Sequence, residues 1–161
     1  MLPYRKCVVI VLRKSDLVFC AERIDVADAW QLPQGGVNPR EDYAAAAARE
    51  LEEETGITSI NFVRQTENDY FYDFPENVQE KILQTQGRVK YRGQIAKFVL
   101  FDFRGDESEI NLSHDTVEFS QWKWLSPFQI LDKIVPFKRT FYQKGFNALG
   151  LCRPYFSMTY R

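Results

Sequence analysis

The feature that most constrains the fold is the stretch from Gly35 to Ile57 (GGVNPREDYAAAAARELEEETGI). Its centre is a run of alanines followed by Arg, Leu and Glu, which all have high helix propensity. Asn38 and Pro39 are typical of a helix start, and Gly56 is typical of the position just past a helix end. The stretch therefore predicts a helix over residues 42–55 that is entered through a loop.

Three glutamates of this helix, Glu50, Glu53 and Glu54, share one face, because residues three and four positions apart are neighbours on a helix. Like charges at this spacing destabilise an isolated helix. A Mg²⁺ or Mn²⁺ ion would remove the conflict, since such ions bind carboxylate oxygens and keep water or phosphate in their other positions. The alternative is a solvated acidic face with Arg40 and Arg49 as local partners, which is the commoner role of a charge run.

Fixed positions at fixed spacing within this stretch favour the metal site. The matching positions are Gly35, Glu41, Arg49, Glu50, Leu51, Glu53, Glu54, Gly56 and Ile57. They fit the Nudix box in full, and the chain resembles the Nudix hydrolases, which cleave a nucleoside diphosphate linked to a further group. A match at so many spaced positions is far more specific than a single glycine motif.

The resemblance implies a loop–helix–loop that holds two or more Mg²⁺ or Mn²⁺ ions. The residues that it assigns to these ions are Gly35, Glu50, Glu53, Glu54 and Glu118. Arg49 is expected to hold the catalytic carboxylates in place, and Glu41 is expected to assist the outer metal shell. On this basis the acidic face of the helix is part of a catalytic site.

Two glutamates compete for the role of the base that takes a proton from the attacking water. By the resemblance, Glu118 lies across the metal site and is either a further metal ligand or this base, and Glu53 is its rival. From the residues alone, Glu118 would be an ordinary glutamate of a strand. His114, the single histidine of the chain, is not expected to be a base or a ligand.

The rest of the chain predicts strands around the central helix. Runs of β-branched and aromatic residues predict strands at residues 6–13, 17–22, 60–65, 70–74, 95–103 and 117–124. Helices are expected from Ser126-Pro127 and over residues 136–149, and loops at residues 29–36 and 75–92. This order predicts an α+β fold, a mixed sheet between helices in an α/β/α sandwich, as the resemblance also implies. The length suits a single domain of residues 1–161.

Motifs outside the box narrow the resemblance to one branch of the family. They are found at residues 30–36, 93–98, 109–112, 118–124 and 136–139, in the order seen in bacterial RNA pyrophosphohydrolases and the similar dinucleoside polyphosphate hydrolases. The resemblance covers roughly residues 3–144. It implies removal of pyrophosphate from 5′-triphosphorylated RNA ends, cleavage of diadenosine tetraphosphate to ATP and AMP, or both.

Basic and aromatic residues in or near these motifs are candidates for substrate binding. A polyphosphate brings several negative charges, and the cations that could neutralise them are Arg5, Arg23, Lys97, Lys138 and Arg139. The resemblance favours Arg5 and Lys138, and Gln34 is included with the substrate-binding residues. Phe137 is a candidate platform for a base, with core packing as the alternative. The three tryptophans are expected in the core.

Composition excludes several classes of function. The formal net charge of −1 provides no global basic field for duplex DNA or other long nucleic acid. No apolar run approaches the ~20 residues that span a bilayer. The three cysteines have no metal-type spacing and are expected to be buried free thiols, which favours a reducing, cytoplasmic setting. No pattern in the sequence indicates an oligomeric state.

Two other functions remain as alternatives. The first is a Nudix hydrolase that acts on another nucleotide, such as a nucleoside triphosphate, a nucleotide sugar or NADH. The second is a non-catalytic Nudix domain that binds a nucleotide or an RNA end. Loss of carboxylates from the box would indicate the second, and none is lost in this sequence.

Overall fold

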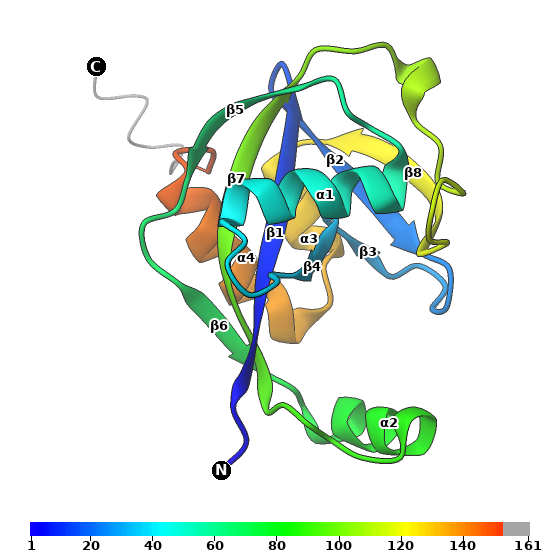
Figure 1. Ribbon diagram of the computed structural model, residues 1–161, viewed down its shortest axis with the longest axis vertical. Helices are drawn as coiled ribbons and strands as arrows, with labels where there is room; N and C mark the ends of the chain where they lie inside the picture. Colours follow the sequence, from blue (N-terminus) through cyan, green and yellow to red (C-terminus); the bar gives the residue numbers. More distant parts are fainter. Residues whose placement is uncertain (153–161) are drawn as a thin grey trace.

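The computed structural model of the protein describes residues 1–152, and in it a mixed sheet lies between two helical layers (Figure 1). The central strands β1 (Tyr4–Lys14) and β7 (Gly93–Phe103) pair in parallel, with Val9 opposite Phe98. The predicted α/β/α sandwich is confirmed. Residues 153–161, for which the sequence offers no interpretation, lie outside the described residues.

The remaining strands extend the sheet on both sides of this central pair. They are β2 (Leu17–Arg23), β3 (Trp30–Gln31), β4 (Gln34–Gly36), β5 (Ile60–Gln65), β6 (Tyr70–Asp73) and β8 (Phe119–Leu125). The order is β3-β2-β1-β7-β5, with β4 paired to β1, β6 to β7 and β8 to β2. All of these pairings other than β1 with β7 are antiparallel.

Both faces of the sheet are covered, which explains why β1 reads as a continuous apolar run. Helix α1 (Tyr43–Thr55) covers one face, where Val8, Ile10 and Leu12 pack in the same cluster as Leu51. Helices α3 (Pro127–Lys133) and α4 (Pro136–Ala148) cover the other face (Figure 1). There the alternate residues of β1 join a cluster with the buried aromatic side chains of α4. Because side chains alternate along β1, this one strand contributes residues to the hydrophobic clusters on both faces of the sheet.

Two segments that the sequence predicts as loops contain regular structure. Residues 29–36 hold the short strands β3 and β4, and residues 75–92 hold helix α2 (Glu76–Gln86). The prediction for residues 75–92 was wrong because α2 buries none of its residues in the described structure. With only a few apolar residues among glutamines, glutamates and a lysine, the helical periodicity of this segment is weak.

The predicted start of α1 also needs correction. Asn38 and Pro39 lie in the loop before the helix, and Asp42 is the N-cap, with its side chain accepting a hydrogen bond from the Ala45 N–H at 2.7 Å. The predicted helix end is confirmed, because Gly56 has a φ of 73° and its N–H donates to the Glu52 carbonyl at 2.8 Å. A left-handed residue at this position is most often glycine.

Other expectations about the core are also met by the described residues. All three cysteines are free and buried. Trp30 is buried, whereas Trp122 and Trp124 are half-buried and pack around the buried ring of Phe19. Within residues 1–152, the helices are all too short or too polar to cross a bilayer.

Candidate active site

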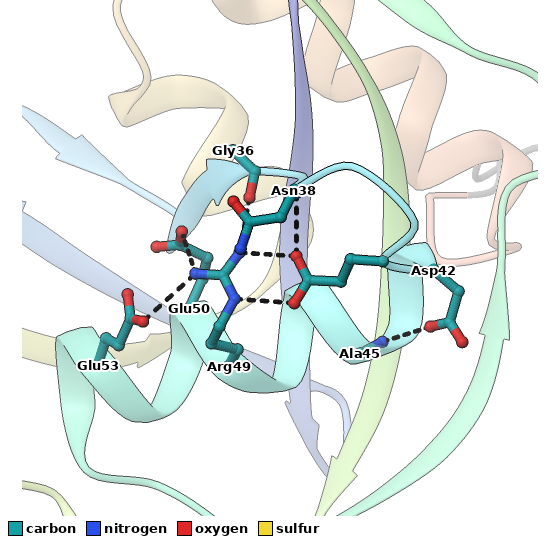
Figure 2. Close-up of polar contacts among 8 residues, drawn as sticks. Gly36, Asn38, Asp42, Ala45, Arg49, Glu50 and Glu53 are labelled. Carbon is teal, nitrogen blue, oxygen red and sulfur yellow. Dashed lines mark hydrogen bonds and ion pairs between the residues drawn. The ribbon is translucent and has the colours of Figure 1, made fainter.

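Arg49 connects the loop before α1 to the carboxylates of the helix (Figure 2). Its Nε and Nη2 donate to the two oxygens of Glu41 at 2.8 and 2.9 Å, and Nη2 also donates to the Gly36 carbonyl at 2.9 Å. Its Nη1 donates to Glu50 at 2.9 Å and to Glu53 at 3.3 Å. One guanidinium therefore positions two helix glutamates relative to the loop.

Glu41, in the loop before α1, holds the Arg49 guanidinium on the side opposite the helix glutamates. Its Oε1 also accepts a hydrogen bond from the Asn38 N–H at 3.0 Å. The bonds from Arg49 and from the Asn38 backbone lower the pKa of the Glu41 carboxyl to about 2, so that it stays ionised at any physiological pH. The loop and the helix are thus joined by charge-assisted hydrogen bonds, which are stronger than neutral ones.

Glu54 is the most buried of the helix glutamates, with 7% of its surface exposed. Its Oε2 is buried and has no hydrogen-bond partner among the described residues. Burial, followed by the charges of Glu50 and Glu118, raises the pKa of Glu54 to about 9. Burial also raises the pKa of Glu50. A buried carboxylate without a partner is costly, so that this position calls for a cation.

These residues fit a divalent metal ion. The donors are carboxylate oxygens, which Mg²⁺ and Mn²⁺ prefer, and one of them is buried without a partner in the described structure. Within residues 1–152 the side chains form no ready-made cage of three or more acidic, histidine or cysteine ligands. Glu50 and Glu53 instead each direct one oxygen to Arg49. Such an open arrangement suits Mg²⁺, which keeps several positions for water and phosphate.

A cleft of about 810 Å³ opens beside these carboxylates. Most of the residues that the sequence predicts for the site line it: Arg5, Arg23, Gln34, Gly35, Glu50, Glu54, Glu118, Phe137 and Lys138. They come from both helical layers and from four strands or strand ends, and the fold brings them together. The volume lies in the upper part of the usual range for ligand sites, roughly 300–1,000 Å³.

Lys138 is the buried cation of the cleft, with 7% of its surface exposed. Its Nζ lies 5.5 Å from the centre of the Tyr72 ring, and it has no ion-pair partner among the described residues. Burial, and then the charge of Arg23, lowers the pKa of Lys138 to about 8. A buried ammonium without a counter-ion favours an anionic ligand.

The two arginines of the cleft differ in their surroundings. Arg23 forms an ion pair with Asp25, with Nη2 and Oδ2 2.5 Å apart. Arg5 makes no ion pair within residues 1–152, and its guanidinium lies over Gly36, where a Cβ would come within 2.9 Å of Nη2. Arg5 is therefore available to a substrate without breaking an existing pair.

The predicted residue Gln34 is hydrogen-bonded in the cleft to two residues that the sequence did not assign to the site, Tyr72 and Gln94. The Gln34 Nε2 and the Tyr72 hydroxyl both donate to the Gln94 Oε1, at 3.0 and 2.5 Å. The Gln34 Oε1 is buried and has no partner in the described part of the chain. The alternation in residues 70–74 places the Tyr72 side chain on the inner face of β6, which is the signal that could have identified it.

Phe137 combines the two roles that the sequence leaves open. It packs against the core through Tyr72, with ring centres 5.7 Å apart, and it also lines the cleft. It is half-buried. One face of the ring can thus belong to the core while another surface is open to a ligand.

Several predicted residues lie elsewhere in the described structure. Lys97 is absent from the described cleft lining and is bound to Asp69, with Nζ and Oδ1 3.1 Å apart, and to the Glu67 carbonyl. Arg139 forms an exposed ion pair with Asp132. Since neither Lys97 nor Arg139 is in the described cleft lining, the proposed substrate site does not include them.

The two rival bases are placed differently. Glu118 is exposed, lies just before β8 and lines the cleft. The Glu53 side chain is about one-third exposed and contacts Arg49. The Glu53 carbonyl accepts from the Asp115 and Thr116 N–H groups at 3.3 and 3.2 Å, and thereby holds the loop that leads to Glu118. His114 lies in this loop, 3.9 Å from Glu52.

Gly35 allows Glu50 to reach its position, because a Cβ at Gly35 would overlap the Glu50 carboxyl group. We expect Gly35→Ala to displace this carboxyl group and to lower kcat/KM by at least about tenfold, which corresponds to about 1.4 kcal/mol. The fold should persist, since the overlapping atoms are the end of a flexible side chain. Steady-state kinetics with a thermal melt would test this, and full activity in a folded Gly35→Ala protein would contradict it.

Comparisons with known proteins agree with this geometry. A model of the NUDIX domain family matches residues 3–145. The RNA pyrophosphohydrolase of Dinoroseobacter shibae is 43% identical over 153 residues, which cover 92% of this chain and 93% of that protein. The chloroplastic Nudix hydrolase 27 of Arabidopsis thaliana is 44% identical over 160 residues, which cover 95% of this chain and 67% of that protein.

Solved structures show the same fold at low identity. A binary complex of the C. elegans Ap4A hydrolase has a TM-score of 0.59 and 20% identity, with 91% of this chain and 98% of that chain covered. The E. coli dihydroneopterin triphosphate pyrophosphohydrolase has a TM-score of 0.65 and 16% identity, with 88% and 96% covered. From its Nudix box, its fold and its relatives, the chain belongs to the Nudix hydrolase family.

Proposed function

We propose that this protein is a metal-dependent pyrophosphohydrolase that acts on the 5′-triphosphate end of RNA. It would release pyrophosphate and leave a 5′-monophosphate. The observation that carries the proposal is the presence, in one cleft, of partly buried carboxylates and of the buried cation Lys138, which has no ion-pair partner among residues 1–152. Relatives of 40–46% identity that cover most of this chain are named RNA pyrophosphohydrolase, which supports this choice of substrate.

The metal ions in this proposal are Mg²⁺ or Mn²⁺, two or more with substrate. The residues that would hold them are Gly35, Glu50, Glu53, Glu54 and Glu118. When bound, such ions supply charge neutralisation for the phosphates and a lower pKa for a coordinated water. Arg49 keeps Glu50 and Glu53 in place for this purpose, and Glu53 or Glu118 accepts the proton of the attacking water.

The other cleft residues bind the substrate. Arg5 and Lys138 neutralise phosphate oxygens, since both are without an ion-pair partner in the described structure. Arg23 adds a third cation at the rim. The ring of Phe137 provides a surface for a base, and such stacking contributes roughly 1–3 kcal/mol for any base. Gln34 has an unpartnered buried oxygen in the described residues, which can accept a hydrogen bond from substrate.

A direct comparison of substrates tests the proposal. The purified protein with Mg²⁺ would be given 5′-triphosphate RNA, 5′-diphosphate RNA and diadenosine tetraphosphate at matched concentrations. We expect the highest kcat/KM on an RNA end. A clear preference for the dinucleotide would identify a dinucleoside polyphosphate hydrolase instead, and binding without any turnover would identify a non-catalytic Nudix domain.

The lowered pKa of Lys138 predicts how activity depends on pH. Since the ammonium loses its proton near pH 8 in the free protein, kcat/KM should decline above about pH 8, where the free enzyme is titrated. Lys138→Arg should remove this decline because arginine stays charged. The measurement is kcat/KM against pH for both proteins. An identical alkaline limb in the two profiles would contradict this role for Lys138.

We also propose a reducing, cytoplasmic location. Three buried free thiols support it, because disulfides form and persist in oxidising compartments. The Arabidopsis relative is named chloroplastic, so that tagging and imaging of the full-length protein in its own cell would be the test.

A further inference from the structure

Helix α2 has no role in the fold core. It connects β6 to β7, begins after Pro75 and ends at Gly87, and none of its residues is buried in the described structure. Figure 1 shows it well separated from α1, at the end of the molecule where the chain starts. Helices of fewer than ~12–15 residues are marginal in water without packing. Because α2 contributes no buried residue to the described cores, its side chains remain available to a ligand.

One face of α2 forms a wall of the cleft. The residues that line the cleft are Asn77, Val78, Lys81, Ile82, Thr85 and Gln86. They recur at a spacing of four, which places them in one stripe along the helix. The stripe contains a lysine, amides, a hydroxyl and two half-buried aliphatic side chains. Both glutamates of the helix, Glu76 and Glu80, are absent from the described cleft lining.

The composition of this stripe matches a polyanion with apolar faces. Lys81 and Asp25, the partner of Arg23, line the same cleft. Against the effect of burial, Arg23 lowers the pKa of Asp25, and the charge of Lys81 makes the smallest contribution in the same direction. The rim around Arg23 and the face of α2 thus line the same cleft as the α1 carboxylates, and Figure 1 shows α2 well separated from α1. A substrate whose triphosphate lies at the carboxylates can extend from there between these two walls.

We propose that the cleft face of α2 binds the RNA chain beyond its first nucleotide, with Lys81 on a backbone phosphate and Ile82 with Val78 against a base. This inference rests on the proposed function, because it assigns part of the same cleft to the body of an RNA substrate. Each nucleotide after the first brings one backbone phosphate, and only a chain of sufficient length reaches α2. The contribution of α2 should therefore increase with RNA length.

The test compares Lys81→Gln with Lys90→Gln, which removes the same charge from an exposed residue of the same segment that is not in the described cleft lining. The substrates are a nucleoside triphosphate, a 5′-triphosphate dinucleotide and longer 5′-triphosphate oligomers of one repeated sequence. For single strands, one phosphate contact contributes about 0.7 to the slope of log affinity against log salt concentration. Such a contact therefore makes the affinity roughly fourfold higher at 0.15 M salt than at 1 M salt.

We expect Lys81→Gln to lower kcat/KM for the longer oligomers about fourfold more than for the nucleoside triphosphate at 0.15 M salt, through KM, and to flatten the salt slope by about 0.7. Lys90→Gln should match the wild type. Ile82→Thr should raise KM for the oligomers, and Leu83→Thr, an exposed neighbour outside the described lining, should not.

The outcomes separate this inference from the proposed function. If the wild type releases no pyrophosphate from any RNA, the proposed function fails. If the wild type is active and Lys81→Gln behaves like Lys90→Gln at every length, the role of α2 is refuted. A loss that is equal on the nucleoside triphosphate and on the oligomers would also refute it, because α2 would then act on the first nucleotide.

Discussion

Glu53→Gln is expected to lower kcat for 5′-triphosphate RNA by about 10²–10⁴-fold, the usual contribution of a general base, and further if a metal ligand is also lost. The glutamine cannot accept a proton, and it lacks the charge that a metal ion would bind. The fold should be retained, because the Gln Oε1 can still accept from Arg49 and the backbone carbonyl that holds residues 115 and 116 is unchanged.

Glu52→Gln is the matched control for this change. It removes the same charge from the adjacent residue of the same helix, whose side chain is 50% exposed and lies 3.9 Å from His114. Both variants should melt within ~2 °C of the wild type, since surface substitutions rarely change stability by more than about 0.5 kcal/mol. Wild-type turnover by a folded Glu53→Gln protein would show that Glu53 is neither base nor ligand.

The same assay in Glu118→Gln separates the two rival bases. If Glu118 is the base, its variant loses kcat even at saturating Mg²⁺, while Glu53→Gln raises KM for the metal ion. If Glu53 is the base, kcat at saturating Mg²⁺ is lost in Glu53→Gln, and Glu118→Gln is affected mainly in KM for the metal ion. Measurements of kcat against Mg²⁺ concentration for both variants distinguish these cases.

Local signals predicted α1 and its surroundings well. The alanine run, the Gly56 end and the spacing of the glutamates all act within one helix, and the structure places them as the spacing requires. The β-branched run of residues 6–13 likewise predicts a strand, and the structure forms β1 there, with both faces covered. In these segments, local propensity and tertiary packing agree, which is the condition under which sequence patterns are informative.

The cleft lining differs from the sequence prediction where a residue's position depends on tertiary placement. Lys97 has the same chemistry as Lys138, but the register of β7 brings it to Asp69 and away from the cleft. Tyr72 and Gln94 come from neighbouring strands and meet only through pairing of β6 with β7. Helix α2 is short and mostly polar and buries none of its residues in the described structure, so that its few apolar residues give only a weak helical signal. Such features follow from which elements pair, which no local pattern encodes.

Glu54→Gln is expected to have the opposite effect on stability from its effect on activity. Burial raises the pKa of Glu54 from 4.5 to about 9, so that the folded protein binds a proton that the unfolded chain has released. The contribution of Glu54 to the free energy of unfolding is therefore largest below pH 4.5, and it falls as the pH rises toward 9. The slope is at most about 1.4 kcal/mol per pH unit. Glutamine resembles the protonated carboxyl, so that the variant should lose this slope.

In metal-free buffer at about pH 8, we thus expect Glu54→Gln to melt above the wild type, by ~2–4 °C for each kcal/mol gained. Activity should nevertheless fall by orders of magnitude, because a carboxylate in the metal site is lost. Thermal melts of both proteins, with Glu52→Gln as the control, would measure the difference. A metal-free Glu54→Gln protein that melts below the wild type would show that the buried carboxylate is not under electrostatic penalty.

Added Mg²⁺ should reverse this order. An ion that binds only the folded protein stabilises it by RT ln(1 + [L]/Kd), about 2.7 kcal/mol at a hundred times Kd. In the wild type it must displace the proton of Glu54, so that the stabilisation should be larger at about pH 8.5 than at about pH 5.5. In Glu54→Gln it should be small at both. If both expectations hold, the buried carboxylate that destabilises the metal-free fold is also the group that couples metal binding to the stability of the folded protein.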